Sequence, residues 1–237
     1  MSAEHPSLPP AEFDSFADDY DASLAGGLSV SGEDKDFFAR GRIEWLTSCL
    51  RKARINPRQI LDFGCGTGSS FDLLLGLGTE VELLGTDVSA RSLAVARKRN
   101  PSARVRLSLA ADFTERNTVD VAFCNGVFHH IPLADRAGAV ASVFRALRPG
   151  GLFAFWENNP WNPGTRYVMS RIPFDRDAIT LSPPEARRLL RAGGFQVLRL
   201  DFLFYFPRAL AALRTMEPAL RKLPFGAQYQ VLCRKPT

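Results

Sequence analysis

One short stretch restricts the fold of this chain more than any other feature. Residues 60–68 read ILDFGCGTG, so an apolar strand passes directly into a glycine-rich turn. Glycine lets the backbone turn sharply and lets a ligand lie against it. A helix expected at 69–77 would add exposed backbone amides at its start. The stretch therefore predicts an α/β fold that binds a nucleotide-like ligand where its first strand ends.

Polar residues follow at the places where a nucleotide would need them. Asp87 ends the next expected strand, 23 residues after Gly64, and a carboxylate there can accept hydrogen bonds from both hydroxyls of a ribose. Asp112 and Phe113 follow the third strand, where an acid and a ring could hold the amine and the face of an adenine. Asn125 ends the fourth strand, where the strand order of such a sheet should reverse and ligands bind.

Short apolar strands alternate with helices from residue 59 onwards. We expect strands at 60–63, 81–86, 104–109, 119–124, 151–156, 196–204 and 227–233, and helices at 69–77, 90–99, 133–147 and 183–192. This alternation predicts a doubly wound, mostly parallel sheet with helices on both faces.

Two helices are expected before the sheet. Phe13, Phe16 and Tyr20 are spaced as one helical stripe, and Gly26 with Gly27 should end that helix. A second helical pattern runs over 35–54. We therefore divide the chain into a disordered lead at 1–12, an N-terminal helical lid at 13–58 and a catalytic domain at 59–237.

Two segments of the catalytic domain interrupt the alternation. Residues 158–181 are rich in proline, asparagine and aromatic side chains, and residues 203–225 form a second insert, with 207–223 expected to be helical. Both follow late strands, and a long irregular connection in a compact domain is usually functional. We expect both inserts to face the substrate.

The motifs resemble, in order, those of the class I S-adenosylmethionine-dependent methyltransferases, and the chain is similar to small-molecule members of types 11 and 12. LDFGCGTG resembles their first motif, LLGTDVS their second-strand motif, and AADF, FCNGVFHHIP and LRPGG the later motifs. The resemblance implies a Rossmann-like, seven-stranded sheet whose last strand is antiparallel. It also implies S-adenosyl-L-methionine as methyl donor and S-adenosyl-L-homocysteine as product.

The resemblance further implies which residues hold this cofactor. The cofactor would lie over 62–68, with Asp87 at the ribose and Asn125 near the sulfonium. Tyr20 would approach the cofactor carboxylate, with Arg40 or Arg42 as its charge partner. The full set implied is Tyr20, Arg40, Asp62, Gly64, Cys65, Gly66, Gly68, Asp87, Val88, Asp112, Phe113 and Asn125.

A nicotinamide-dependent oxidoreductase is the competing interpretation of the loop. Its fingerprint is Gly-x-Gly-x-x-Gly, in which the last glycine permits the close approach of a pyrophosphate. Here the glycines are Gly64, Gly66 and Gly68, and Ser69 stands where that last glycine would be. The loop therefore favours the methyltransferase interpretation.

Two adjacent histidines and one glutamate are the candidate catalytic residues. His129 and His130 follow the fourth strand, and Glu157 ends the fifth. Histidine titrates near neutral pH, so either imidazole could act as a general base towards a hydroxyl or an amine. The alternatives are that the histidines support the loop or the cofactor edge, and that Glu157 belongs to a turn rich in asparagine and proline.

Candidate substrate-binding residues come from the two inserts. They are Asn158, Trp161, Arg166 and Tyr205. An apolar wall beside arginines suits an amphiphilic or phosphorylated acceptor. The alternative is that the aromatic side chains belong to the core of the last strand and its helix.

Charge, cysteine spacing and apolar runs limit what can be expected for metal sites, disulfides and cellular location. The net charge is +5, and the four cysteines are scattered without a Cys-x-x-Cys pair, so we predict no metal site, no disulfide framework and a reducing, cytoplasmic location. No apolar run approaches the roughly 20 residues of a membrane-spanning helix, and the start does not resemble a signal peptide. The basic C-terminal region leaves peripheral membrane contact open.

The sequence thus predicts methyl transfer to an oxygen or nitrogen of a small-molecule acceptor. Natural-product, quinone-like and lipid-linked or cell-surface sugar intermediates are the acceptor classes considered. The alternatives are an RNA or protein methyltransferase, or a non-catalytic regulatory protein that binds S-adenosylmethionine. Nucleic acid is not the expected partner, because no stripe of alternating aromatic and basic side chains is evident.

Overall fold

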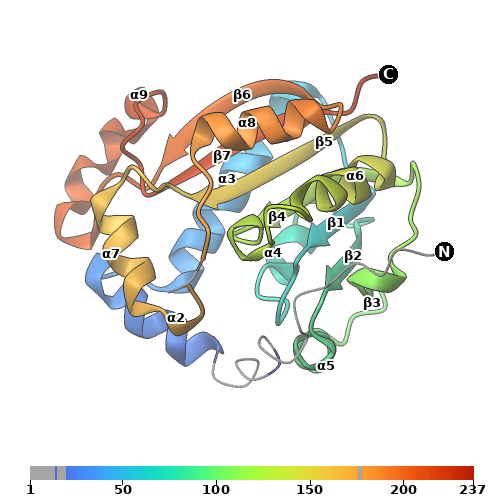
Figure 1. Ribbon diagram of the computed structural model, residues 1–237, viewed down its shortest axis with the longest axis horizontal. Coiled ribbons are helices and arrows are strands. Elements are labelled where there is room, and N and C mark those ends of the chain that lie inside the picture. Colours follow the sequence, from blue (N-terminus) through green and yellow to red (C-terminus); the bar gives the residue numbers. More distant parts are fainter. Residues whose placement is uncertain (1–13, 15–19, 176–177) are drawn as a thin grey trace.

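Seven strands form one sheet in the order β3-β2-β1-β4-β5-β7-β6 in the computed structural model, which describes residues 14, 20–175 and 178–237 (Figure 1). All neighbouring pairs are parallel except those of β7, which runs antiparallel to β5 and β6. The strands are β1 (Gln59–Phe63), β2 (Glu82–Asp87), β3 (Val105–Leu109), β4 (Val119–Asn125), β5 (Leu147–Asn158), β6 (Gln196–Leu203) and β7 (Gln228–Arg234). The expected Rossmann-like sheet with an antiparallel last strand is confirmed.

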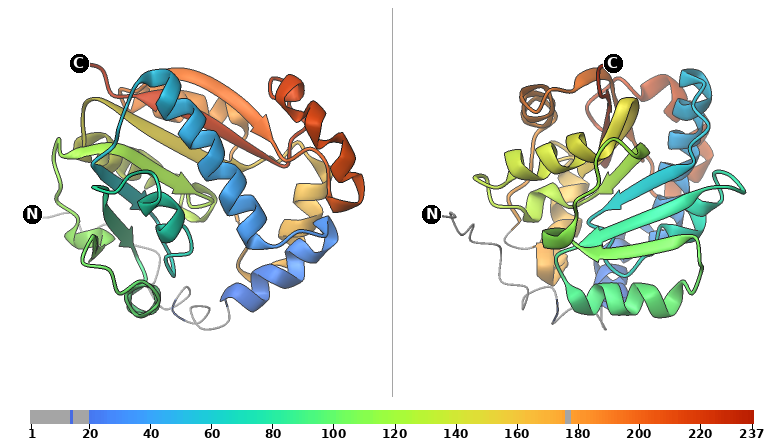
Figure 2. Two further views of the ribbon diagram at one scale, coloured as in Figure 1. Left: turned by 180° about the vertical axis from the view of Figure 1, so that it is seen from behind. Right: turned by 90° about the vertical axis from the view of Figure 1, so that its right-hand side faces the viewer.

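Helices cover both faces of this sheet (Figures 1 and 2). One face packs against α3, α4 and α5, and the other against α6 and α8. The α-helices are α2 (Tyr20–Leu28), α3 (Lys35–Ala53), α4 (Phe71–Leu75), α5 (Ala90–Arg99), α6 (Arg136–Ala146), α7 (Pro163–Arg171), α8 (Pro183–Ala192) and α9 (Glu217–Leu220). Short 3-10 helices are η1 (Ser29–Ser31), η2 (Ala110–Asp112), η3 (Phe128–His130), η4 (Pro173–Asp175) and η5 (Arg208–Met216).

The central strands are apolar on both sides because both sides are covered. In β4, Val121 and Phe123 pack in the cluster that includes α3, whereas Ala122 and Cys124 pack in the cluster that includes α6 and α8. Successive side chains of a strand point to opposite faces, and a parallel sheet between two helical layers must be apolar on both. This explains why the strands appear as short continuous apolar runs in the sequence.

Local polar side chains fix where several helices begin. Asp34 starts α3, because its Oδ1 accepts a hydrogen bond from the backbone N–H of Phe37 at 2.7 Å. Ser182 and Glu185 form a capping box at the start of α8. Such caps satisfy amide donors that have no partner inside the helix.

The prediction that Gly26 and Gly27 end the first helix is wrong. α2 continues through Gly26 and Gly27 to Leu28, and the chain turns only after η1, at Gly32, whose φ is 71°. A Cβ on Gly27 would lie 2.4 Å from Cγ1 of Ile172, so this glycine allows close packing of α2 against the segment after α7. The expected disordered lead lies outside the described residues, as do Phe13 and Phe16 of the predicted helical stripe.

The second insert also differs from the expected helix. Residues 207–223 contain the 3-10 helix η5, which has a non-helical backbone at Leu210, and then the short α9, which ends at Leu220. Pro218 stands at the start of α9, where a missing N–H costs nothing. No helix of the described part of the chain has the length and apolar character needed to cross a membrane.

Candidate active site

The glycine loop lies where the strand order reverses, between the carboxyl ends of β1 and β4. Gly64, Gly66 and Gly68 have φ values of 74°, 51° and 77°, which disfavour other residues. A Cβ on Gly64 would lie 2.4 Å from Cγ2 of Val127, whereas a Cβ on Gly66 would meet nothing within 4 Å. The loop is therefore packed tightly against the turn that follows β4 but is open at Gly66, where a ligand would lie.

Asp87 ties this loop to the end of β2. Its Oδ2 accepts a hydrogen bond from the N–H of Gly66 at 2.8 Å, and its Oδ1 accepts one from Ser89 at 2.9 Å. Each oxygen of a carboxylate can accept a further hydrogen bond, so two ribose hydroxyls can still be bound. The Ser89 hydroxyl also donates to Oδ1 of Asp14 at 2.5 Å, so Asp14 lies at the same turn.

The other residues implied for the cofactor lie in mixed surroundings. Asp62 is buried, and burial together with repulsion from Asp87 raises its pKa to about 7. Val88 is 45% exposed and Asp112 is exposed, while the ring of Phe113 is buried. Cys65 is buried in the loop, and burial raises its pKa well above the usual thiol range.

Asn125, at the end of β4, has a side-chain oxygen that could accept a hydrogen bond from a ligand. Its Oδ1 is buried and has no hydrogen-bond partner among the residues that the structure describes. A buried acceptor without a partner costs free energy. The atom therefore suits a ligand that brings a polarised or positively charged group to this point.

The two arginines predicted as partners of the cofactor carboxylate differ in burial. Arg40 is exposed, whereas Arg42 is buried and its Nη1 donates to Oε1 of Gln228 at 3.0 Å. Arg42 is also close enough to stabilise the ionised carboxylate of Asp62. Tyr20 is the first residue of α2. Of the two arginines, Arg42 is the better placed.

A cavity of about 360 Å³ opens beside Asn125 and Gly126. It lies between α2, α3, α7 and the ends of β4, β5 and β7, and residues 204–207 of the second insert close one side. Its walls are mostly apolar and include Leu24, Leu28, Phe37, Phe38, Val168, Met169, Ile172, Phe174, Phe204, Tyr205, Phe206 and Pro207. A mostly apolar cleft with a few polar groups is the usual form of a small-molecule site.

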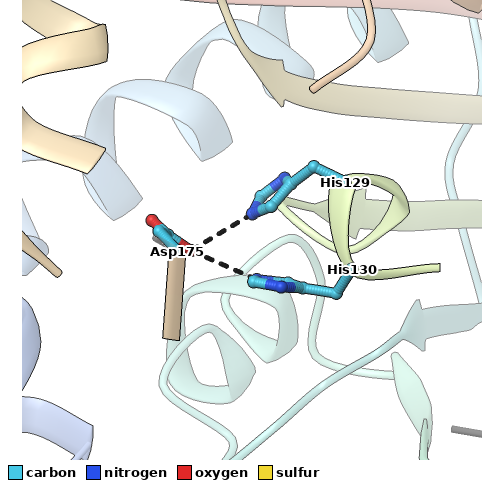
Figure 3. Close-up of side chains that lie close together, drawn as sticks. All are labelled: His129, His130 and Asp175. Carbon is cyan, nitrogen blue, oxygen red and sulfur yellow. Dashed lines mark hydrogen bonds and ion pairs between the residues drawn. The ribbon is translucent and has the colours of Figure 1, made fainter. Parts of the chain in front are cut away.

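Four side chains form a buried acid–imidazole cluster at one part of this cavity: Glu157, His129, His130 and Asp175. Glu157 Oε2 lies 2.6 Å from Nδ1 of His129. Asp175 Oδ1 lies 3.3 Å from Nε2 of His129 and 3.2 Å from Nε2 of His130. Figure 3 shows both imidazoles pointing at this carboxylate.

Burial and charge act against each other in the cluster. Burial alone would lower the pKa of His129, but the carboxylates of Glu157 and Asp175 raise it to about 10. Burial would raise the pKa of Asp175, but hydrogen bonds from both imidazoles lower it to about 2. Burial lowers the pKa of His130, and Asp175 offsets only part of that effect. The ion pair is thus concentrated on His129.

Glu157 lies behind His129 and does not line the cavity. Its side chain is 1% exposed, and its Oε1 accepts a hydrogen bond from the N–H of Phe128 at 2.8 Å. Any role of Glu157 in chemistry therefore passes through His129. Asn158, one residue further, does line the cavity and accepts a hydrogen bond from Gln228 at 3.2 Å.

The substrate-binding candidates separate into two groups. Asn158 and Tyr205 line the cavity, although the Tyr205 hydroxyl lies 2.6 Å and 2.7 Å from the carbonyls of Leu220 and Leu223. Trp161 and Arg166 are exposed and lie outside the lining. The residues that sequence reasoning missed are Asp175 and Gln228, which come from distant segments and carry no local motif.

The reversal of the strand order, the glycine loop and the antiparallel last strand define a Rossmann-like fold of the methyltransferase type. Residues 61–153 match the model of the family Methyltransf_12, described as a methyltransferase domain. This part of the chain is therefore similar to the methyltransferase domains of that family, and S-adenosylmethionine is the methyl donor that the family implies.

The chain is also similar to curated methyltransferases. The chain is 39% identical over 98 residues to a trans-aconitate 2-methyltransferase of Acidovorax sp. (strain JS42). The aligned residues make up 41% of this chain and 37% of the relative. It is 28% identical over 181 residues to a ubiquinone biosynthesis O-methyltransferase of Thiobacillus denitrificans, covering 70% and 75%. The chain thus spans little more than a third of the first of these relatives.

Solved structures extend the likeness to the whole fold. A methyltransferase structure from Thermotoga maritima has a TM-score of 0.66 at 18% identity, covering 94% of this chain and 98% of the other. One from Mesorhizobium loti has a TM-score of 0.58 at 22% identity, covering 83% and 99%. At these identities the likeness concerns the fold alone.

The residues present fit S-adenosylmethionine. The space over Gly66 is open, Asp87 retains acceptor capacity for a ribose, and the buried Oδ1 of Asn125 lacks a partner in the described structure. These three features lie around the ends of β1, β2 and β4, which is the crevice where such folds bind ligands.

Proposed function

We propose that the chain transfers the methyl group of S-adenosylmethionine to an oxygen or nitrogen of a small acceptor bound in the cavity. The observation that carries this proposal is the position of the cavity. It begins at Asn125 and Gly126, directly beside the cofactor crevice, and His129, His130 and Asp175 of the acid–imidazole cluster line it. A reacting atom held there would lie between a methyl donor and a group able to take a proton.

The cavity favours an apolar acceptor that carries a hydroxyl group, such as a phenol. Trans-aconitate and the quinone precursor in the names of the relatives are both oxygen acceptors, but a tricarboxylate would need several cations. Among the described residues of the lining, Lys35 and Arg42 are the only Lys or Arg side chains, and most of the other lining residues are aromatic or aliphatic. A phenol, unlike a carboxylate, also needs a base, and His130, whose pKa is lowered by burial, would be the candidate.

The chain would contribute mainly by holding the reactants in line. The cofactor supplies an activated methyl group, so the protein must align the acceptor and exclude water. The glycine loop, Asp87 and Arg42 would bind the cofactor, and Asn158 with Gln228 would orient the acceptor. His129 and His130 would face the reacting atom, and Glu157 would hold His129 in place.

Methyl transfer can be tested with radiolabelled S-adenosylmethionine and two kinds of acceptor. One set comprises catechols with and without an alkyl chain, and the contrasting acceptor is trans-aconitate. We expect label in the catechols. Label in trans-aconitate alone would contradict an apolar acceptor, and failure of the folded protein to bind S-adenosylmethionine would overturn the proposed activity.

A further inference from the structure

We propose that the ring of Phe204 determines which acceptors the cavity takes, by presenting a flat aromatic wall that selects a planar aromatic ring. Gly41 is a positioning residue in this scheme, because it sets how closely that ring lies against α3. The inference deepens the proposed function and rests on it. It assigns the part of the cavity that distinguishes a phenol from a saturated alcohol of the same size.

The backbone of Phe204 has a conformation that an aromatic residue rarely adopts. Phe204 follows β6 directly and has a φ of 62°, in the left-handed region. There the Cβ comes too close to the following carbonyl oxygen, so bulky residues avoid this region. A strained backbone persists only where the surrounding structure holds it, and such positions cluster at functional sites. The conformation of Phe204 therefore needs an explanation in terms of where it places the side chain.

Hydrogen bonds on both sides hold Phe204 in this conformation. Its carbonyl accepts a hydrogen bond from the N–H of Ala227, just before β7, at 2.9 Å. The N–H groups of Tyr205 and Phe206 both donate to Oε1 of Glu217, at 3.1 Å and 3.2 Å. The start of the second insert is thus fastened both to the start of β7 and to α9, and these contacts maintain the strain at one residue.

Gly41 allows the ring of Phe204 to approach the backbone of α3. A Cβ on Gly41 would lie 2.6 Å from Cε1 and 3.0 Å from Cζ of Phe204, so no side chain fits between them. Glycine inside a helix is unfavourable relative to alanine, yet Gly41 lies inside α3. Two unfavourable features, a glycine within a helix and an aromatic residue at positive φ, thus place the same ring.

The ring of Phe204 forms one wall of the cavity together with Phe37 and Phe38. Its centroid lies 5.0 Å from that of Phe38, with an interplanar angle of 69°, and 6.0 Å from that of Phe37. The rings of Phe37 and Phe38 are 5.2 Å apart at 84°. All three residues line the cavity. We call them the aromatic corner.

Charged side chains fix the outer side of the aromatic corner. The guanidinium of Arg214 lies 4.5 Å from the centroid of the Phe37 ring, and its Nη2 pairs with Oε1 of Glu33 at 2.8 Å. Arg214 Nε also donates to the carbonyl of Phe206 at 3.1 Å. The corner is therefore held in place without an acceptor, and a preformed wall reduces the cost of ordering side chains on binding.

This arrangement suits a planar ring better than a saturated one. Aromatic rings prefer offset-stacked or edge-to-face arrangements with centroids about 4.5–7 Å apart, and the three rings of the corner have this spacing among themselves. A phenol ring against the corner would add further pairs of this kind, each of which stabilises binding beyond the burial of apolar area. A saturated ring of the same size gains the burial alone.

Two probes that differ mainly in the planarity of the ring test the role of Phe204. They are butylcatechol and the butylcyclohexanediol with the same substitution pattern, each titrated by calorimetry into protein saturated with S-adenosylhomocysteine. We expect the wild-type protein to prefer the catechol. Phe204→Leu should weaken catechol binding by about 2- to 12-fold, the value of one aromatic pair. Affinity for the diol should stay close to wild type, because leucine is also apolar.

Equal affinities of the wild-type protein for the two probes would overturn the proposal. A wild-type preference retained in Phe204→Leu would also overturn it, because the three rings would then be core contacts between α3 and the second insert. Affinity for S-adenosylhomocysteine reports that each variant is folded. A folded wild-type chain that binds no S-adenosylhomocysteine would instead overturn the proposed function.

Gly41→Ala tests the positioning of the ring, with Gly138→Ala in α6 as the control. The added Cβ must displace the Phe204 ring, whereas a Cβ on Gly138 meets nothing within 4 Å. We expect Gly41→Ala to weaken butylcatechol binding by about fivefold, the lower end of the cost of overpacking. Gly138→Ala should leave it unchanged.

The double variant Gly41→Ala/Phe204→Leu shows whether Gly41 acts through the ring. A leucine side chain ends before the position of Cε1, so the effect of Gly41→Ala on catechol binding should nearly vanish in the Phe204→Leu background. Additive effects of the two changes would contradict the positioning role of Gly41. Wild-type catechol affinity in Gly41→Ala alone would contradict it as well.

Discussion

Single carboxylates in this molecule have different roles because their surroundings differ. Asp87 keeps acceptor capacity at a strand end, Glu157 is enclosed behind His129, and Asp62 is buried beside another acid. Each position follows from the sequence, since each acid ends or nearly ends a buried strand. Their energetic roles depend on neighbours that the sequence alone does not place.

Asp62 should make cofactor binding depend on pH. Its pKa of about 7 without ligand is raised by burial and by Asp87, and the positive charges of S-adenosylmethionine should favour its ionised form. Affinity is then weaker below pH 7, where Asp62 is protonated, and rises towards pH 7 before levelling. Calorimetric titrations between pH 5.5 and 8 measure this.

The matched variant is Asp62→Asn, which should bind S-adenosylmethionine with a flatter pH dependence over the same range. Equal slopes for the two proteins would show that another group controls the titration. Because the folded pKa of Asp62 is raised above its unfolded value, the wild-type fold should also lose stability as pH rises from about 4 to about 7.

Glu157→Gln should destabilise the fold more than it weakens cofactor binding. The amide cannot accept from both Phe128 N and His129 Nδ1 as the carboxylate does, and an unsatisfied buried polar group costs about 1–3 kcal/mol. Urea denaturation measures the loss, and calorimetry should find cofactor affinity within about twofold of wild type, a difference of about 0.4 kcal/mol. The same change at the exposed Glu44 is the control, and equal stability of the two variants would contradict the account.

At the scale of elements, the strands and the helices that cover them could be predicted from local sequence, whereas the ends of some helices could not. β1, β2 and β4 are short apolar runs bounded by turn residues, so their positions follow from composition over a few residues. The pair Gly26 and Gly27 appears locally as a helix end. It instead lies inside α2, because Gly27 is required by a neighbour 145 residues later in the chain, Ile172.

This pair of glycines gives a matched test. In Gly27→Ala the new Cβ would meet Ile172 Cγ1 at 2.4 Å, so we expect a loss of about 1–3 kcal/mol from overpacking. In Gly26→Ala nothing lies within 4 Å, so the change should raise stability by about 0.5–1 kcal/mol through helix propensity. Chemical denaturation of both variants measures the difference, and equal stability would mean that α2 does not pack as described.

At the scale of the whole molecule, the cofactor crevice and the acceptor cavity differ in how they depend on the sequence. The crevice follows from local motifs, whereas the cavity follows from tertiary packing. The crevice is built by consecutive strand–turn–helix units, so motif order alone predicts the glycine loop, Asp87 and Asn125 as its residues. The cavity joins α2, α7, η4 and the second insert, and its residues meet only through tertiary packing. Asp175 could not be identified because no spacing in the sequence links it to His129 and His130.

The central claim is that this assembly binds S-adenosylmethionine at the ends of β1 and β2. The most direct measurement is calorimetric titration of the purified protein with S-adenosylmethionine and S-adenosylhomocysteine, repeated with Asp87→Ala and with Glu80→Ala as a surface control. We predict binding of both ligands, unchanged in Glu80→Ala and weakened in Asp87→Ala by about 1.5–3 kcal/mol, the value of hydrogen bonds to a charged group. Absence of binding in folded wild-type protein, or wild-type affinity in Asp87→Ala, would contradict the account.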